Sequence, residues 1–144
     1  MNTKALFSSQ RSDWETPQDL FERLDEEFHF TLDPAASEEC HKCSRFFTEK
    51  QDGLLQPWTG ERVFCNPPYG RKIGDWAKKA CEEAQNPDTI VVMLLPARTD
   101  TRWFHRYIYG KAEIRFLKGR LKFGKAKNSA PFPSMVVIWE RKEK

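Results

Sequence analysis

The sequence of 144 residues contains no long hydrophobic run, and its longest, Ile90 to Leu95, has the length of a single strand. A membrane helix needs about 20 apolar residues, so we expect no membrane span. The polar N-terminus has no signal-peptide core, and four cysteines in a chain without an export signal are expected to be reduced, which predicts a cytoplasmic protein. The length, without repeats or low-complexity linkers, predicts one domain over residues 14–144 after a flexible segment at residues 1–13.

Residues typical of hydrolytic or metal chemistry are also scarce. The three histidines are scattered, and no Gly-x-Ser-x-Gly pattern occurs. Cys40-His41-Lys42-Cys43 could form half of a zinc site, but no second pair of cysteines stands at a matching distance. The remaining cysteines, Cys65 and Cys81, fall at expected core positions. We therefore expect no metal.

The net charge of +3 is unevenly distributed along the chain. Residues 98–127 contain ten Lys and Arg and two acids, a local charge of +8 that leaves −5 for the rest. A basic segment with interleaved aromatic side chains is typical of a surface that contacts nucleic acid, although many domains carry an ordinary basic face. The aromatic residues of this segment include Trp103, Phe104, Tyr107, Tyr109, Phe116 and Phe123.

The most informative motif is Asn66-Pro67-Pro68-Tyr69, which follows the apolar run Val63-Phe64-Cys65 and precedes a helical pattern. It is therefore expected at the end of a buried strand, where open α/β sheets bind ligands. The two prolines stiffen the turn and fix the Asn66 amide and the Asn66 and Pro67 carbonyls beside the flat ring of Tyr69. Fixed acceptors next to an aromatic ring suit a planar amino group such as N6 of adenine. Two prolines alone would indicate only a surface turn after a strand, whereas the flanking Asn66 and Tyr69 favour a binding site.

The first half of the chain predicts one helix and three short strands. Thr16 as N-cap and Pro17 at the first helical position predict a helix over about residues 17–28. Its apolar face is formed by Leu20, Phe21, Leu24 and Phe28. The short β-rich runs are Phe30 to Asp33, Arg45 to Phe47 and Val63 to Cys65.

The second half predicts two helices and a β-rich end. Apolar residues from Ile73 to Ala84 recur at helical spacing, and Trp103 to Tyr107 indicate a third helix closed by Gly110. The continuous run Thr89 to Leu95 is typical of a central parallel strand buried on both faces.

The C-terminal part alternates apolar and polar residues. Ile114/Phe116 and Leu121/Phe123 flank Lys118-Gly119-Arg120, and a last strand is expected from Met135 to Trp139, so the sheet should finish with a hairpin. The element order predicts a compact α/β sandwich.

The order of these motifs resembles that of the phage-type DNA N6-adenine methyltransferases, a family of S-adenosylmethionine-dependent enzymes, over nearly the whole chain. The resemblance implies a class I methyltransferase-like (Rossmann-like) fold with a mostly parallel central sheet and an antiparallel C-terminal hairpin. It is carried by Thr16-Pro17, Leu32-Asp33-Pro34-Ala35-Ala36, Asp52-Gly53-Leu54, Asn66-Pro67-Pro68-Tyr69, Leu95-Pro96-Ala97-Arg98 and Gly119-Arg120-Leu121-Lys122-Phe123.

The resemblance also implies roles for single residues. Thr16-Pro17 would lie against the methionine part of S-adenosylmethionine, and Asp33-Pro34 would hold the cofactor, helped by Ala35 and Ala36. Glu49 would bind the ribose hydroxyls, and Asp52 would lie near the cofactor's adenine. The loop Asp33 to Ser37 departs from the general class because it has no glycine, and alanine allows a less close backbone approach.

The implied reaction transfers a methyl group to adenine N6 in double-stranded DNA. Asn66 and the Pro67 carbonyl would accept hydrogen bonds from N6, and Tyr69 would stack on the flipped-out base. Arg98, Arg102, Arg120 and Lys122 are expected to contact the DNA. The motif alone also fits an RNA-base or protein-glutamine methyltransferase, and the glycine-poor loop leaves open a catalytically inactive DNA-binding module.

Overall fold

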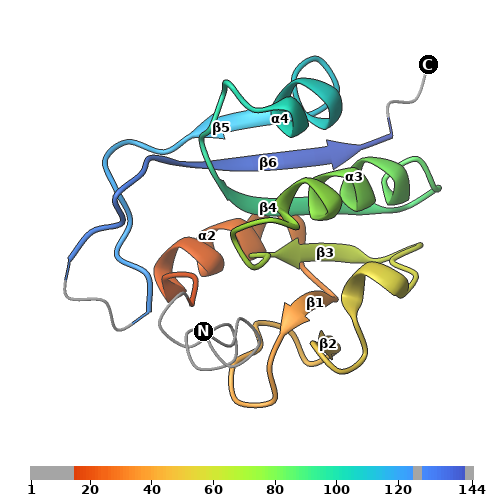
Figure 1. The fold of residues 1–144 in the computed structure, drawn as a ribbon. Coiled ribbons are helices and arrows are strands. Elements are labelled where there is room, and N and C mark those ends of the chain that lie inside the picture. The colour runs from red at the N-terminus through yellow and green to blue at the C-terminus, as the bar shows by residue number, and fades with distance from the viewer. Residues whose placement is uncertain (1–14, 125–127, 142–144) are drawn as a thin grey trace.

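The computed structural model describes residues 15–124 and 128–141. The flexible segment predicted at residues 1–13 lies outside these residues. Helices cover both faces of a central sheet (Figure 1), and the class is α/β with parallel and antiparallel strands. Among the residues that the structure describes, none of the helices has the length and apolar character that crossing a membrane would require.

A four-stranded sheet in the order β3, β4, β6, β5 forms the centre of the fold. β3 and β4 pair in parallel, whereas β6 is antiparallel to both β4 and β5. β5 therefore runs in the same direction as β3 and β4. The strands are β3 (Arg62–Cys65), β4 (Ile90–Pro96), β5 (Glu113–Phe116) and β6 (Ser134–Glu140).

A smaller parallel pair, β1 (Asp33–Ala36) and β2 (Phe46–Thr48), lies beside β3. A parallel bridge between Leu32 and Val63, with the Phe64 N–H donating to the Leu32 carbonyl at 3.0 Å, connects β1 to β3. β1 and β2 run in the same direction as β3. Among the described strands, β6 alone runs the opposite way.

The two faces of β4 carry two separate cores, because alternate residues of a strand point to opposite faces. Val91, Met93 and Leu95 pack in one core with α3 (Ile73–Glu83) and α4 (Arg102–Tyr107). The other face of β4 packs against α2 (Gln18–Phe28). The sequence prediction of a central strand buried on both faces is confirmed.

The helices follow the predicted apolar spacing. The four apolar residues predicted for the first helix are buried in α2, and Ile73, Trp76, Ala77 and Ala80 are buried in α3. The N-cap of α2 is Pro17 rather than the predicted Thr16, and no side chain caps the helix. The Thr16 side chain instead contacts the end of β3, as described below.

The first strand begins later than predicted. Thr31 and Leu32 both donate their backbone N–H groups to the Arg62 carbonyl, at 2.7 and 3.3 Å. The chain runs beside β2 only from Asp33, whose N–H donates to Arg45. The Asp-Pro-Ala-Ala segment, predicted to be a loop, is therefore the strand itself.

The C-terminal pairing of β5 with β6 is antiparallel as predicted, but the expected hairpin around Lys118-Gly119-Arg120 is wrong. Residues 117–133 separate the two strands, and Leu121 to Phe123 form no strand. Phe123 is 2% exposed and packs in the core beside α2. Burial of Phe123, rather than strand pairing, accounts for the apolar pattern there.

Candidate functional site

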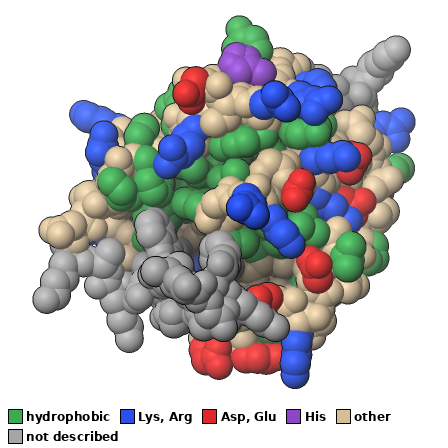
Figure 2. Space-filling view, in the orientation of Figure 1, with side chains coloured by type: hydrophobic (Ala, Val, Ile, Leu, Met, Phe, Trp, Pro, Cys, Tyr) green, Lys and Arg blue, Asp and Glu red, His purple; other side chains and the backbone are tan. Residues whose placement is uncertain are grey.

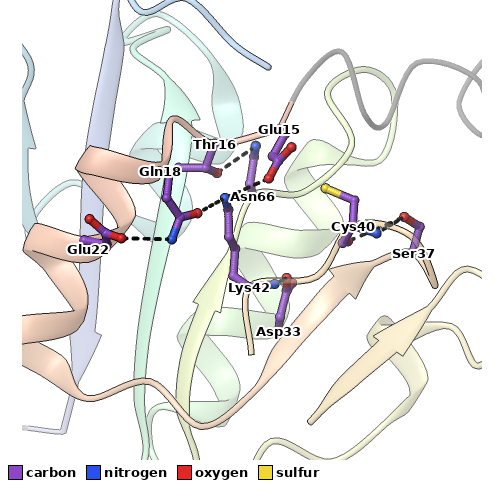
Figure 3. A network of polar contacts seen from close by, with 9 residues as sticks. All are labelled: Glu15, Thr16, Gln18, Glu22, Asp33, Ser37, Cys40, Lys42 and Asn66. Atoms are coloured by element: carbon purple, nitrogen blue, oxygen red, sulfur yellow. Dashed lines mark hydrogen bonds and ion pairs between the residues drawn. The ribbon is translucent and has the colours of Figure 1, made fainter. Parts of the chain in front are cut away.

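Several of the predicted site residues meet at the carboxyl edge of the parallel strands. Asn66 follows β3 directly, and Leu32 lies beside Val63, so Asp33 and Asn66 both lie near this edge. The segment that precedes α2 reaches the same place. A pocket there is lined by Glu15, Thr16, Asp33, Ala35, Cys40, Lys42, Phe64 and Asn66. Figure 3 shows the polar contacts among the lining residues other than Ala35 and Phe64.

Asp33 is 5% exposed and holds the loop that follows it. Its Oδ1 accepts a hydrogen bond from the Ala35 N–H at 3.3 Å, and its Oδ2 accepts one from the Lys42 N–H at 2.9 Å. A buried carboxylate is stable when backbone donors compensate its lost hydration. Asp33 therefore shapes one wall of the pocket.

Lys42 was not predicted as a site residue, yet its side chain is 8% exposed and lines the pocket. Its Nζ lies 3.0 Å from Glu15 Oε1 and 2.7 Å from Gln18 Oε1. The ammonium also lies 5.7 Å from the centroid of the Phe21 ring. Lys42 thus fixes the segment before α2 against the loop after β1. Nothing in the local spacing around Lys42 indicates this, because its partners are far away in sequence.

The side chain of Asn66 contacts that same segment. Asn66 Nδ2 donates a hydrogen bond to Thr16 Oγ1 at 3.1 Å, and Thr16 is 3% exposed. The contact joins the two sequence motifs that were predicted to bind the cofactor and the target base.

Tyr69 packs against both cores. Its hydroxyl group donates to the Leu94 carbonyl of β4 at 3.0 Å. The rings of Phe123 and Phe132 contact it edge-on, with centroids 6.3 and 5.7 Å away. The orientation of the tyrosine ring is therefore set by the central strand and by two aromatic rings from the 117–133 connection.

Other predicted cofactor residues lie outside the pocket lining, namely Pro17, Pro34, Ala36, Glu49 and Asp52. Asp52 has a positive φ of 57° and accepts the Leu54 N–H at 3.1 Å, which caps the 3-10 turn η2 (Gly53–Leu55). A Cβ at Gly53 would lie 2.1 Å from the Pro34 carbonyl oxygen, so only glycine allows this approach. The Asp52 turn is thereby packed against β1.

The four predicted DNA contacts, Arg98, Arg102, Arg120 and Lys122, are all exposed. Arg98 follows the carboxyl end of β4. Its guanidinium carbon lies 6.0 Å from the centroid of the Phe132 ring, which itself contacts Tyr69. Figure 2 shows the face of the molecule seen in Figure 1. Lys and Arg are the commoner charged side chains in its upper half, and Asp and Glu gather at its lower edge.

The cysteines have no sign of metal chemistry in the described part of the chain. Cys40, Cys43 and Cys81 carry free thiols, and within residues 15–124 and 128–141 no three His, Cys, Asp or Glu side chains are grouped to hold a metal ion. Burial raises the pKa of Cys43 to about 12, and burial also raises the pKa of Cys40. Thiols with raised pKa values are poor ligands and poor nucleophiles near neutral pH.

The arrangement is that of an α/β protein with a ligand pocket at the carboxyl ends of parallel strands. The family model for DNA N-6-adenine-methyltransferase (Dam) matches residues 3–144, and the chain belongs to this family, as the sequence motifs predicted.

Two phage proteins are similar to this chain. It is 34% identical over 110 residues to the DNA N-6-adenine-methyltransferase of Escherichia phage T1, and the match covers 75% of this chain and 45% of the phage T1 protein. It is 30% identical over 149 residues to the DNA N-6-adenine-methyltransferase of Haemophilus phage HP1 (strain HP1c1), and the match covers 98% of this chain and 84% of the phage HP1 protein. The match thus spans about half the length of the T1 relative and most of the HP1 relative.

Proposed function

We propose that this protein transfers a methyl group from S-adenosylmethionine to N6 of adenine in double-stranded DNA. The observation that carries the proposal is the position of Asn66: its amide lies at the carboxyl end of β3, in the pocket that contains Asp33 and Thr16. Family membership supports the reaction class, and the pocket lining supports the choice of residues.

The donor set of the pocket fits the methionine end of S-adenosylmethionine. That end carries a sulfonium, an ammonium and a carboxylate, and the pocket offers the carboxylates of Asp33 and Glu15 together with the ammonium of Lys42. Phe64 adds an apolar wall. When bound, the cofactor supplies an activated methyl group. Further cofactor contacts are proposed for Thr16, Pro17, Pro34, Ala35, Ala36, Glu49 and Asp52.

The protein's own task is to orient the target amine. The Asn66 side-chain oxygen and the Pro67 carbonyl accept the two N6 hydrogens, which favours a pyramidal nitrogen with an available lone pair. Pro67 and Pro68 hold these acceptors in a stiff turn. No strong general base is required, because the proton leaves N6 after the new bond has formed.

The strand arrangement supports a class I methyltransferase-like, Rossmann-like fold. The strands succeed one another in the order β2, β1, β3, β4, β6, β5, with β6 as the reversed strand. A parallel sheet with a single antiparallel strand places the carboxyl ends of its other strands at one edge, and this is the edge at which Asn66 lies.

The DNA partner is proposed to approach the same edge. The target adenine would leave the duplex and stack on Tyr69, while Arg98, Arg102, Arg120 and Lys122 contact the backbone. Arg98 and Tyr69 both contact Phe132, which brings a basic group close to the base pocket. The relatives belong to phages, so the proposed location is the cytoplasm of a bacterial host.

The test is single-turnover methyl transfer from labelled cofactor to duplexes with and without adenine. Asn66→Ala should lower turnover by about 10²–10³, the usual loss for one preorganised electrostatic contact. The matched control is Asn86→Ala, because Asn86 also donates to a threonine, Thr59, at 3.2 Å but lies after α3. Wild-type rates in Asn66→Ala would overturn the mechanism. Transfer to RNA or to protein glutamine without transfer to DNA would overturn the substrate.

A further inference from the structure

The contact between Thr16 and Asn66 joins two segments that are far apart in sequence. Thr16 Oγ1 lies 3.1 Å from Asn66 Nδ2, and the threonine is almost completely buried, with 3% of its surface exposed. Thr16 was predicted to serve as a helix cap or a cofactor contact, but its side chain contacts the asparagine that is proposed to grip the target amine (Figure 3).

The orientation of this amide decides what it can bind. An asparagine side chain has one acceptor end and one donor end of nearly the same shape. If the –NH2 end faced the target, two sets of N–H groups would oppose each other and the adenine amine would not be held. A partner that accepts from Nδ2 turns Oδ1 toward the other side.

We propose that Thr16 is a positioning residue for Asn66: its hydroxyl oxygen accepts from Nδ2 and so presents Oδ1 to the target amino group. This inference rests on the proposed role of Asn66 in methyl transfer. It adds a second function to a segment that the resemblance assigns to the cofactor alone.

Thr16 is itself held in place by the residues around it. Lys42 Nζ bonds to Glu15 on one side of Thr16 and to Gln18 on the other, at 3.0 and 2.7 Å. The Glu15 carbonyl also accepts the Gly124 N–H at 2.8 Å. Because the Lys42 backbone N–H is bound to Asp33, a continuous set of contacts connects the proposed cofactor acid to the Asn66 amide.

A buried threonine could also bond to the nearest amide without any effect on the reaction. Thr16→Val removes the hydroxyl at nearly constant volume, and Thr16→Ser keeps it. We expect Thr16→Val to slow single-turnover transfer at saturating cofactor about tenfold, the ordinary net effect of one hydrogen bond. Thr16→Ser should restore most of the rate. The control is Thr59→Val, which removes the other Asn–Thr bond described above and should leave the rate unchanged.

The Asn66→Asp background distinguishes an effect of Thr16 on the orientation of the residue 66 side chain from an effect on packing. In Asn66→Asp, both carboxylate oxygens are acceptors, so the side chain has no wrong orientation. Thr16→Val should then change the transfer rate far less in Asn66→Asp than in the wild type. An equal loss in both backgrounds would show that Thr16 acts through packing or cofactor binding and would overturn the proposal.

A readout without activity completes the test. In the cofactor-free protein, nuclear magnetic resonance should show the Asn66 side-chain N–H₂ protons protected from exchange, and Thr16→Val should remove the protection. Unchanged protection, or a wild-type transfer rate in Thr16→Val, would overturn the inference. The outcome for Asn66→Ala is independent: wild-type rates there would reject the proposed function itself, whatever Thr16 does.

Discussion

The hydroxyl group of Tyr69 donates a hydrogen bond to the carbonyl oxygen of Leu94 across 3.0 Å. Leu94 lies near the centre of β4, opposite Val136 of β6, so the tyrosine is hydrogen-bonded to an inner strand of the sheet. T-shaped contacts with two phenylalanine rings confine it further. A ring fixed in this way has one defined plane, which the proposed stacking of the target base on Tyr69 requires.

The Tyr69 contact predicts different effects for two substitutions. Tyr69→Phe keeps the ring and loses one hydrogen bond, so it should lower the free energy of unfolding by about 1 kcal/mol and preserve methyl transfer. Tyr69→Ala should raise the KM for DNA because capture of the flipped base weakens. Urea unfolding and steady-state kinetics would check both. Leu55→Ala, at an apolar side chain that is 78% exposed and lies outside the basic segment, is the control. An unchanged KM for DNA in Tyr69→Ala would show that Tyr69 does not contact the flipped base.

Asp33 is expected to be essential for cofactor binding. Asp33→Ala removes a buried carboxylate from the pocket and leaves the N–H groups of Ala35 and Lys42 without their acceptor. We expect no measurable S-adenosylmethionine binding by calorimetry, with circular dichroism still that of a folded protein. Asp75→Ala, at an exposed position in the first turn of α3, should bind normally. Normal affinity in folded Asp33→Ala would place the cofactor elsewhere.

Position, and not only charge, should decide DNA affinity within the basic segment. Glutamine at Arg98, Arg102, Arg120 or Lys122 should lower affinity, and each lost phosphate contact should reduce the log–log salt slope by about 1. Lys111→Gln is a matched control, because Lys111 precedes β5 and therefore lies at the opposite edge of the sheet. If Lys111→Gln lowered DNA affinity as much as the substitutions at the four residues, the basic segment would attract DNA only non-specifically.

Cys43 should make the protein less stable at alkaline pH. Its pKa is about 12 in the folded protein because of burial, against an ordinary value of 9.0. Above pH 9 the unfolded chain loses the thiol proton while the folded chain retains it, so the unfolded state is favoured as pH rises. Urea unfolding at several pH values should show this decline, and Cys43→Ala should flatten it. A pH dependence identical in the two proteins would contradict the raised pKa.

Local patterns were sufficient for several elements because each depends on neighbours in sequence. The apolar spacing of α2 and α3 defines one buried face per helix, and the continuous run of β4 predicts burial on both faces. The Asn66 turn follows its strand as expected, since a double proline cannot continue a strand in the sheet interior. These features arise from side-chain periodicity and backbone restriction, which a single segment already contains.

The sequence by itself therefore determined the family, the helix faces, the buried central strand and the motif at the end of β3. Only the tertiary structure decided that Thr16 contacts Asn66 instead of capping a helix, that Lys42 ties Glu15 to the loop after β1, and that Phe123 is buried beside Tyr69 rather than paired in a hairpin. The physical reason is the same in each case. These contacts join residues that are distant along the chain, and their energies exist only once the strands are adjacent, so no local spacing can encode them.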